Sequence, residues 1–328
     1  MLNAKITGIA SYVPDYVLTN DELSTMVDTN DEWITTRVGI KERRILKDEN
    51  AGSSFMGTKA VEKLLADTAT KATEIDMIIC ATSNPDYRFP STASVIAHDC
   101  GATSAYGYDI QAACAGFIVS LQAATAYVRS GMYKKVVVVA AEKMSSMTNY
   151  KDRSTCPLFG DAAAAVLVEP TEEENIGVID GVFHVDGIGL PHLLMKAGGS
   201  ARPASHATVD NDEHYVYQEG RAVYKHAVTD MLTSSQDVMK RNGLSVENID
   251  WFVPHQANLR IIEAVGDRLG IDPEKVLVNI EHYGNTSAAS IPLCLDENKG
   301  KLKKGDKIVL TAFGAGFTWG AMYIVWGF

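Results

Sequence analysis

The stretch DIQAACAGFIVSLQAA (residues 109–124) decides the fold of this chain. It runs from a strand-like segment, through a turn of small residues, into a long apolar helix. Cys114 stands at the turn, between Ala113 and Ala115. A cysteine at such a place is either a small hydrophobic residue that fills space or a thiol placed to react. The rest of the sequence has to decide between these two roles.

The C-terminal half repeats this pattern. Residues 106–142 read as strand, turn, helix and strand, and residues 276–314 read in the same way. The strand-like segments IDMIICATSN and IDWFVPHQAN, which begin at Ile75 and Ile249, precede the two copies at similar positions. The sequence therefore predicts an α/β fold with an internal duplication.

A polar, acidic stretch, EPTEEENIG at residues 169–177, separates the two copies. We expect an N-terminal half over residues 1–172, which carries Cys114, and a C-terminal half over residues 173–328. The segment 196–214 is rich in Gly, Ser, Ala and Asp. This composition predicts a long irregular excursion that forms a lid or a pocket wall.

Composition and charge exclude several classes of protein. The chain has 328 residues, of which 46% are hydrophobic, and its net charge of −11 gives no global basic field for nucleic acid. The start of the chain lacks a signal-peptide pattern, and the longest aliphatic run, VVVVAA, is too short to span a membrane. We expect a soluble, cytoplasmic protein. The five cysteines are widely spaced without a C-x-x-C motif, which favours reduced thiols over a disulfide framework or a metal site.

Three polar residues follow strand ends that the duplication would bring together. Cys114 lies at the first strand-to-helix turn, and Asn285 lies at the corresponding turn of the second half. His255 follows the strand that mirrors IICATSN, residues 78–84. A helix start and nearby N–H groups are expected to lower the pKa of the Cys114 thiol. A Cys-His-Asn group serves thiol proteases as well as acyl transfer, so both remain open.

The loop AFGAGFTWG (residues 312–320) is the last element of the predicted site. It does not open a long helix with an acidic residue downstream, so it is not a dinucleotide-binding fingerprint. A tight backbone turn that directs an N–H group at a developing oxyanion is the better interpretation.

Five motifs, DIQAACAGF, FGDAAAAVLV, VPHQANLRI, YGNTSAAS and FGAGFTWG, resemble the β-ketoacyl-acyl carrier protein synthase III family of the thiolase superfamily. The resemblance covers nearly the whole chain. It implies a thiolase-like, five-layered αβαβα fold and a homodimer. It also implies condensation of an acyl-CoA primer with malonyl-acyl carrier protein at the start of fatty acid synthesis, with no metal or redox cofactor.

The resemblance assigns roles residue by residue. Cys114 would be the nucleophile, His255 and Asn285 would hydrogen-bond the malonyl thioester carbonyl, and the N–H groups of Cys114 and Ala315 would form the oxyanion hole. Ala315 stands where many members have Gly, and a positive φ there would cost about 1–2 kcal/mol. Substrate contacts are implied for Trp33, Arg37, Phe89, Arg153, Asn258 and Phe159.

Trp33 and Arg153 resemble a pair that sandwiches the CoA adenine, Arg37 a phosphate contact, and Asn258 a pantetheine contact. Phe89 resembles a residue that crosses the dimer interface into the partner's acyl pocket. Core packing is the alternative role for both aromatic residues. Docking of the acidic carrier protein is implied for Lys225, Arg260 and Arg268, although Asp267 stands where a basic residue is expected.

Other functions remain as alternatives. A related acyl-CoA condensing enzyme of quinolone or polyketide metabolism would share the three residues, so only substrate assays separate it. Hydroxymethylglutaryl-CoA synthase also uses a Glu, and a Cys-His-Asn hydrolase would release free acid. A non-catalytic subunit would normally lack the nucleophile, and Cys114 is present.

Overall fold

The computed structural model describes residues 2–328, which form two mixed sheets. The first has the strand order β1 (Asn3–Tyr12), β7 (Ala162–Thr171), β6 (Val136–Glu142), β4 (Met77–Ala81) and β5 (Tyr106–Ile110). The second has the order β8 (Gly177–Val185), β13 (Thr318–Val325), β12 (Lys307–Gly314) and β11 (Trp251–Pro254). Small two-stranded sheets join β2 (Val17–Thr19) to β3 (Glu42–Arg44) and β9 (Leu193–Met195) to β10 (Val216–Gln218).

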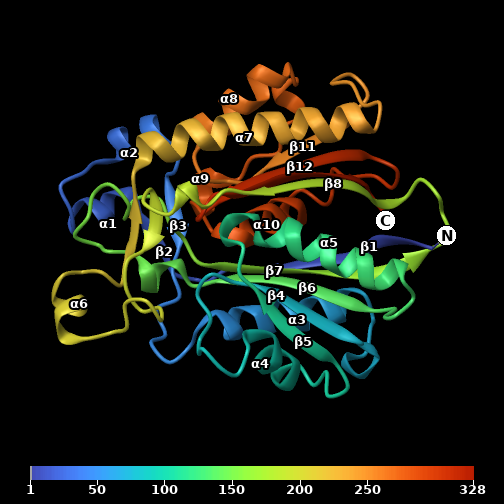
Figure 1. The fold of residues 1–328 in the computed structure, drawn as a ribbon, viewed down its shortest axis with the longest axis horizontal. Coiled ribbons are helices and arrows are strands. Elements are labelled where there is room, and N and C mark those ends of the chain that lie inside the picture. The colour runs from blue at the N-terminus through green and yellow to red at the C-terminus, as the bar shows by residue number, and fades with distance from the viewer. Residues whose placement is uncertain (1) are drawn as a thin grey trace.

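Helices cover both sheets and fill the space between them, as Figure 1 shows. The middle layer holds α5 (Gly116–Arg129) and α10 (Ser290–Glu297). The outer layers are α3 (Ser53–Asp67) with α4 (Thr92–Asp99), and α7 (Gly220–Arg241) with α8 (Leu259–Leu269). Shorter helices lie in the connections: α1 (Asn20–Ser24), α2 (Asp31–Val38), α6 (His206–Asp210) and α9 (Ile280–Tyr283). The order of layers is αβαβα, as the family resemblance implies.

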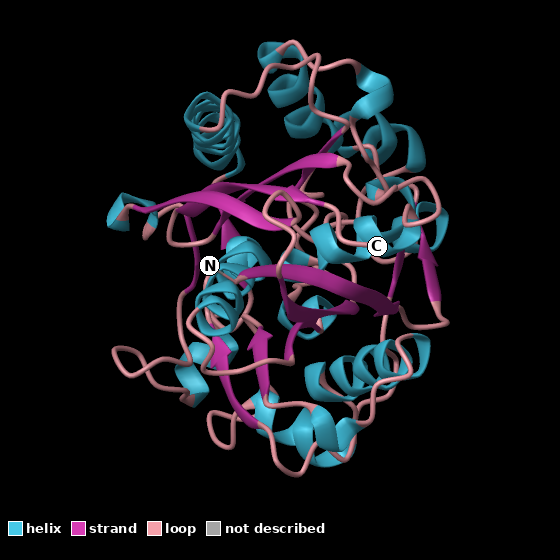
Figure 2. Cartoon of the chain, turned by 90° about the vertical axis from the view of Figure 1, so that its right-hand side faces the viewer, coloured by secondary structure: helices cyan, strands magenta, loops and turns pink. Residues whose placement is uncertain are grey.

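Continuous apolar runs explain why the central strands are covered on both faces. Every residue of β4 and β6 is buried, so each strand contacts helices on both sides of its sheet. Figure 2, turned by 90°, shows the two sheets one above the other with helices between and outside them. No helix within residues 2–328 is long and apolar enough to cross a membrane.

The two sheets repeat each other strand for strand, except at one edge. The positions of β1, β7, β6 and β4 correspond to those of β8, β13, β12 and β11. The counterpart of β5 is not formed, because the strand expected near residue 276 is reduced to a single bridge between Phe252 and Val276. The Gln256 side chain explains this difference, because it forms hydrogen bonds with backbone groups that a strand would pair with β11. It accepts from the Asn279 N–H and donates to the Leu277 carbonyl.

The polar link between the halves lies where it was expected, between the end of β7 and the start of β8. The division at residue 172 into two separate halves stays a prediction. The excursion 196–214 is less irregular than expected, because it contains α6, which begins with a capping box formed by Ser205 and Thr208. Its first residues, Ala197 to Gly199, line the main cavity, so this part is a pocket wall.

Both halves build the same strained turn before their middle helix. The turn Ala113–Ala115 leads into α5, and the turn Ser287–Ala289 leads into α10. Ala113 and Ser287 are the first residues of these turns, and both have a left-handed backbone, with φ of 44° and 51°. Cys114 therefore corresponds to Ala288, and Asn285 lies shortly before the matching turn.

Candidate active site

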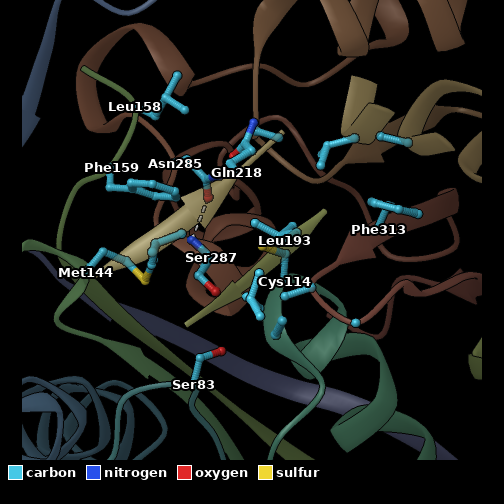
Figure 3. Close-up of a pocket in the computed structure, with 18 of the residues that line it drawn as sticks. Ser83, Cys114, Met144, Leu158, Phe159, Leu193, Gln218, Asn285, Ser287 and Phe313 are labelled. Carbon is cyan, nitrogen blue, oxygen red and sulfur yellow. Dashed lines mark hydrogen bonds between the residues drawn. The ribbon is translucent and has the colours of Figure 1, made fainter. Parts of the chain in front are cut away.

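A cavity of about 1150 Å³ opens where the two copies of the turn meet. Cys114, His255 and Asn285 all line it, together with Ala315 and Phe159. The duplicated fold brings these residues together. Cys114, His255 and Ala315 lie beyond the carboxyl ends of β5, β11 and β12, and Asn285 lies just before the matching turn of the second half. Figure 3 shows Cys114, Asn285 and Phe159 around the same space.

Cys114 lies in the turn directly before α5, partly exposed to the cavity. Small neighbours, Ala113 and Ala115, leave the sulfur accessible from the cavity. The expectation of a lowered thiol pKa is wrong, because burial raises the pKa of Cys114 to about 12. The Ser287 hydroxyl works against this effect through a hydrogen bond, and the Glu142 carboxylate adds to it. Removal of the thiol proton thus needs help beyond the helix start.

His255 is held rigidly at the end of β11. Its backbone N–H donates to the Thr311 carbonyl at 2.8 Å, and its Nδ1 lies 2.7 Å from the Ser290 hydroxyl. Ser290 also accepts from the Gln256 N–H, so its own proton is directed at Nδ1 of His255. This arrangement puts the imidazole proton on Nε2. Burial lowers the pKa of His255 to about 3, which keeps the ring neutral.

Asn285 is oriented by the backbone around it. Its Oδ1 accepts from the Ser287 N–H at 2.8 Å, drawn as a dashed line in Figure 3, so its NH₂ group is left to donate. Its main chain pairs with Leu158 and Gly160, on both sides of Phe159. The cavity therefore holds two neutral donors, the His255 Nε2–H and the Asn285 amide, which suit a carbonyl oxygen that gains negative charge.

The glycine loop completes the site opposite Cys114. A methyl group at Gly314 would come within 2.7 Å of the Cys114 nitrogen, so only glycine leaves that N–H accessible. Ala315 follows and lines the cavity. The left-handed residues of this loop are Gly316 and Phe317 rather than Ala315, so the strain considered for Ala315 is absent.

Comparison with known proteins decides the family. The model described as "3-Oxoacyl-[acyl-carrier-protein (ACP)] synthase III" matches residues 108–187, and its C-terminal counterpart matches residues 239–326. A β-ketoacyl-[acyl-carrier-protein] synthase III from Bacteroides thetaiotaomicron is 57% identical over 100% of this chain and 97% of its own length. The chain belongs to the β-ketoacyl-acyl carrier protein synthase III family.

Other relatives agree with this result. The synthase III of Porphyromonas gingivalis W83 is also 57% identical, over 100% of this chain and 97% of its own length. The crystal structure of 3-oxoacyl-[acyl-carrier-protein] synthase III from Aquifex aeolicus superposes with a TM-score of 0.90 at 42% identity, covering 98% of this chain and all of that one. The predicted family, thiolase-like fold and acyltransferase-type condensing activity at the start of fatty acid synthesis are confirmed.

Three of the residues implied for substrate contact lie together: Trp33, with Arg37 and Arg153 beside its ring. The Asn30 side chain caps α2 by accepting from the Trp33 N–H, and Arg37 lies one turn further along the same face. The Arg153 guanidinium lies 5.1 Å from the centre of the Trp33 ring, and that of Arg37 lies 6.0 Å from it. Arg37 itself lines the cavity.

Asn258, Phe159 and Phe89 have different surroundings. Asn258 lines the cavity, but its Oδ1 caps α8 by accepting from the Arg260 N–H. Phe159 is buried beside Asn285 and lines the cavity. Phe89 lies outside this group: its side chain is 87% exposed, which excludes core packing within one chain.

The implied docking residues lie on the outer helices α7 and α8. Lys225, Arg260 and Arg268 are exposed, and Arg260 also lines the cavity and covers the Tyr224 ring at 5.5 Å. Glu263 and Asp267 are exposed on the same helix as the two arginines. The surface around Arg260 is therefore of mixed charge.

Sequence reasoning missed the residues that hold the site in place. Ser290 orients His255, Ser287 orients Asn285, and Glu142 lies buried behind Ser287. Only Glu142 leaves a signal in the sequence, since it is a carboxylate at the end of the apolar run VVVVAAE. No group of three or more His, Cys, Asp or Glu within residues 2–328 is arranged to hold a metal ion.

Proposed function

We propose that this enzyme condenses an acyl-CoA primer with malonyl-acyl carrier protein through an acyl thioester on Cys114. The products are 3-oxoacyl-acyl carrier protein, CoA and CO₂. One observation carries the proposal: an accessible thiol, an N–H group kept open by Gly314, and the donors of His255 and Asn285 all line one cavity.

The first step is transfer of the acyl group. The sulfur of Cys114 attacks the acyl-CoA carbonyl, and the carbonyl oxygen becomes an oxyanion held by the N–H groups of Cys114 and Ala315. Each donor of this kind contributes about 3–4 kcal/mol in other enzymes. The oxyanion then collapses, the bond to the CoA sulfur breaks, and CoA leaves as its thiol after taking up one proton.

The second step forms the carbon–carbon bond. The malonyl carboxylate leaves as CO₂, and its bonding electrons form an enolate whose oxygen accepts from His255 Nε2–H and the Asn285 amide. The enolate carbon attacks the thioester carbonyl, and the Cys114 thiolate leaves. The thioesters themselves activate the carbon, so we expect no metal or redox cofactor in this reaction.

The cavity mouth suits an acyl-CoA. Trp33 offers a flat ring with two guanidinium groups beside it, which can stack an adenine and pair with phosphates. Asn258 lines the path toward Cys114, and Phe159 lines the cavity next to Asn285. The five free cysteines fit a reducing compartment, and we place the reaction in the cytoplasm.

The exposed Phe89 supports a homodimer. The Phe89 side chain is 87% exposed, and a place inside a partner would bury this large apolar ring. We propose that each chain inserts Phe89 into the acyl pocket of a second copy. Lys225, Arg260 and Arg268 would dock the acidic carrier protein, with Asp267 and Glu263 weakening the attraction.

A substrate panel tests the proposed reaction. Straight and branched acyl-CoAs are each mixed with malonyl-acyl carrier protein, and CO₂ release and the carrier-protein product are followed by mass. Stoichiometric CO₂ and 3-oxoacyl-acyl carrier protein support condensation. Release of free acid without CO₂ would instead indicate a hydrolase. A condensed product only with long or unusual primers would place the enzyme in specialised metabolism.

A further inference from the structure

Glu142 is a fully buried carboxylate that the mechanism above does not use. It ends β6, and its Oε1 accepts from the Ser287 hydroxyl at 2.9 Å. Its Oε2 accepts from the Ser83 N–H at 3.0 Å and the Thr82 hydroxyl at 3.3 Å, and the Ala288 N–H donates to the same carboxylate. Burying a charged group is costly, so a carboxylate in this place calls for a reason.

Ser287 connects this carboxylate to the nucleophile. Its hydroxyl donates to Glu142, and it lines the same cavity as Cys114, close enough to lower the pKa of the thiol. In Figure 3 this hydroxyl points away from Asn285, toward the space between Cys114 and Ser83. A hydroxyl both accepts and donates, so Ser287 can take a proton from the thiol while it gives its own to Glu142.

The duplication shows which position of the second half the Glu142 carboxylate occupies. Glu142 and Gly314 end the equivalent strands β6 and β12, and Cys114 and Ala288 are equivalent residues of the two turns. In the first turn, Gly314 leaves the space beside the Cys114 N–H open. In the second turn, the Glu142 carboxylate lies in the matching place, close enough to the Ala288 N–H for this group to lower the pKa of the carboxylate. The turn that binds a substrate oxyanion in one half thus holds an internal carboxylate in the other.

We propose that Glu142, acting through the Ser287 hydroxyl, is the base that accepts the Cys114 proton when the acyl group is transferred. The thiol proton moves to Ser287 Oγ, and the Ser287 proton moves to Glu142 Oε1, while the sulfur electrons form the bond to the acyl carbon. When CoA leaves, the proton returns through Ser287 to the CoA sulfur, and Glu142 is again a carboxylate. Glu142 does not touch the substrate. This role rests on the proposed acyl-cysteine step.

The protonation equilibria agree with this geometry. Burial raises the pKa of the Cys114 thiol, so the resting thiol keeps its proton at neutral pH and must give it up as the acyl group is transferred. Burial raises the pKa of Glu142 to about 7, which makes it a much stronger base than an exposed carboxylate. The proton stays within the buried group until it passes to the departing CoA sulfur, so the transfer moves the negative charge without creating a new one.

Other titratable groups around Glu142 do not replace it. Cys80, on the neighbouring β4, is fully buried, and burial raises its pKa well above the usual value. Asp86 and Asp109 act on Cys80 together with Glu142, and their carboxylates accept backbone N–H groups. His255 is neutral and bound to Ser290, and the Lys143 ammonium donates to the carbonyls of Asp48 and Ala51. Ser287 joins Glu142 to the nucleophile.

The test is the pH profile of acylation, measured by rapid quench and mass as acyl-CoA alone labels Cys114. The acylation rate of the wild-type enzyme should rise with pH and level off above about pH 7, because Glu142 must be unprotonated to accept the proton. Ser287→Ala and Glu142→Gln should acylate about a hundredfold more slowly at pH 7.5, which is within the usual range for a lost general base. Their acylation rates should rise with pH without levelling off. Ala113 has the same left-handed backbone in the twin turn, so alanine fits at residue 287.

Ser120→Ala is the matched control, since Ser120 is a buried hydroxyl on α5 with no partner among residues 2–328. It should keep the wild-type profile. If Glu142→Gln fails to fold, the pH profile of Ser287→Ala alone tests the proposal. If the variants acylate within about threefold of the wild-type rate and their rates level off at the same pH, proton transfer through Ser287 to Glu142 would be overturned, because losing a general base has a larger effect. A wild-type enzyme that takes no acyl group on Cys114 would overturn the proposed function, and the relay with it.

Discussion

Replacing Gly314 with alanine should close the oxyanion hole from behind. The new methyl group would lie 2.7 Å from the Cys114 nitrogen, 3.0 Å from the Ala113 Cβ and 3.1 Å from the Ala112 carbonyl oxygen. Ordinary van der Waals contact begins at 3.4 Å, so the turn or the loop has to move by about 0.7 Å. Such a shift removes the Cys114 N–H from the oxyanion, and losing one donor costs about 3–4 kcal/mol, or about 10²- to 10³-fold in rate.

Single-turnover acylation of Cys114 measures this effect directly. Gly187→Ala is the control, because a methyl group there meets nothing within 4 Å and Gly187 is not left-handed. Both variants should show the circular dichroism of wild type. A Gly314→Ala enzyme that acylates at the wild-type rate with an intact fold would refute the role given to the Cys114 N–H.

Three further predictions follow from the same site. His255→Ala and Asn285→Ala should still take an acyl group on Cys114 but fail to release CO₂ from malonyl-acyl carrier protein; decarboxylation at the wild-type rate would contradict their roles. Because the pKa of His255 is lowered from 6.5 to about 3, the unfolded chain binds more protons between these values. Wild type should therefore lose about 1.4 kcal/mol more unfolding free energy per pH unit than His255→Gln as pH falls from 6.5 toward 3, measured by urea unfolding of both proteins. Phe89→Asp should convert a dimer into monomers in sedimentation, whereas a monomeric wild type would contradict the interface.

The sequence predicts the duplication and the positions of the polar residues because those depend on local patterns. Apolar runs such as residues 136–141 mark buried strands, and a polar residue directly after such a run lies at the edge of the sheet. His255 is identified in this way, and Cys114 and Asn285 are identified from the matching turns of the two halves. The strand expected near Val276 is not formed, since the Gln256 side chain replaces its ladder partners, and a side-chain contact between distant parts of the chain leaves no periodic signal.

The protonation state of the nucleophile could not be predicted from sequence. A helix start favours the thiolate, but burial opposes it, and burial is a property of the packed molecule. In this cavity burial wins, so the thiol pKa rises to about 12. Helix α5 separates Glu142 from Cys114 in the chain, and the two are linked only through Ser287, which comes from the other half. Such a link depends on the fold being assembled.

Covalent labelling of Cys114 tests the central claim most directly. The enzyme is mixed with acyl-CoA alone, digested, and analysed by peptide mass, with hydroxylamine treatment to detect a thioester. We expect one acyl group per chain, on the peptide that contains Cys114, removed by hydroxylamine and largely lost in Cys114→Ser. Label on Cys80 or Cys156, or on no cysteine, would contradict the mechanism and leave Cys114 as a small residue that fills space.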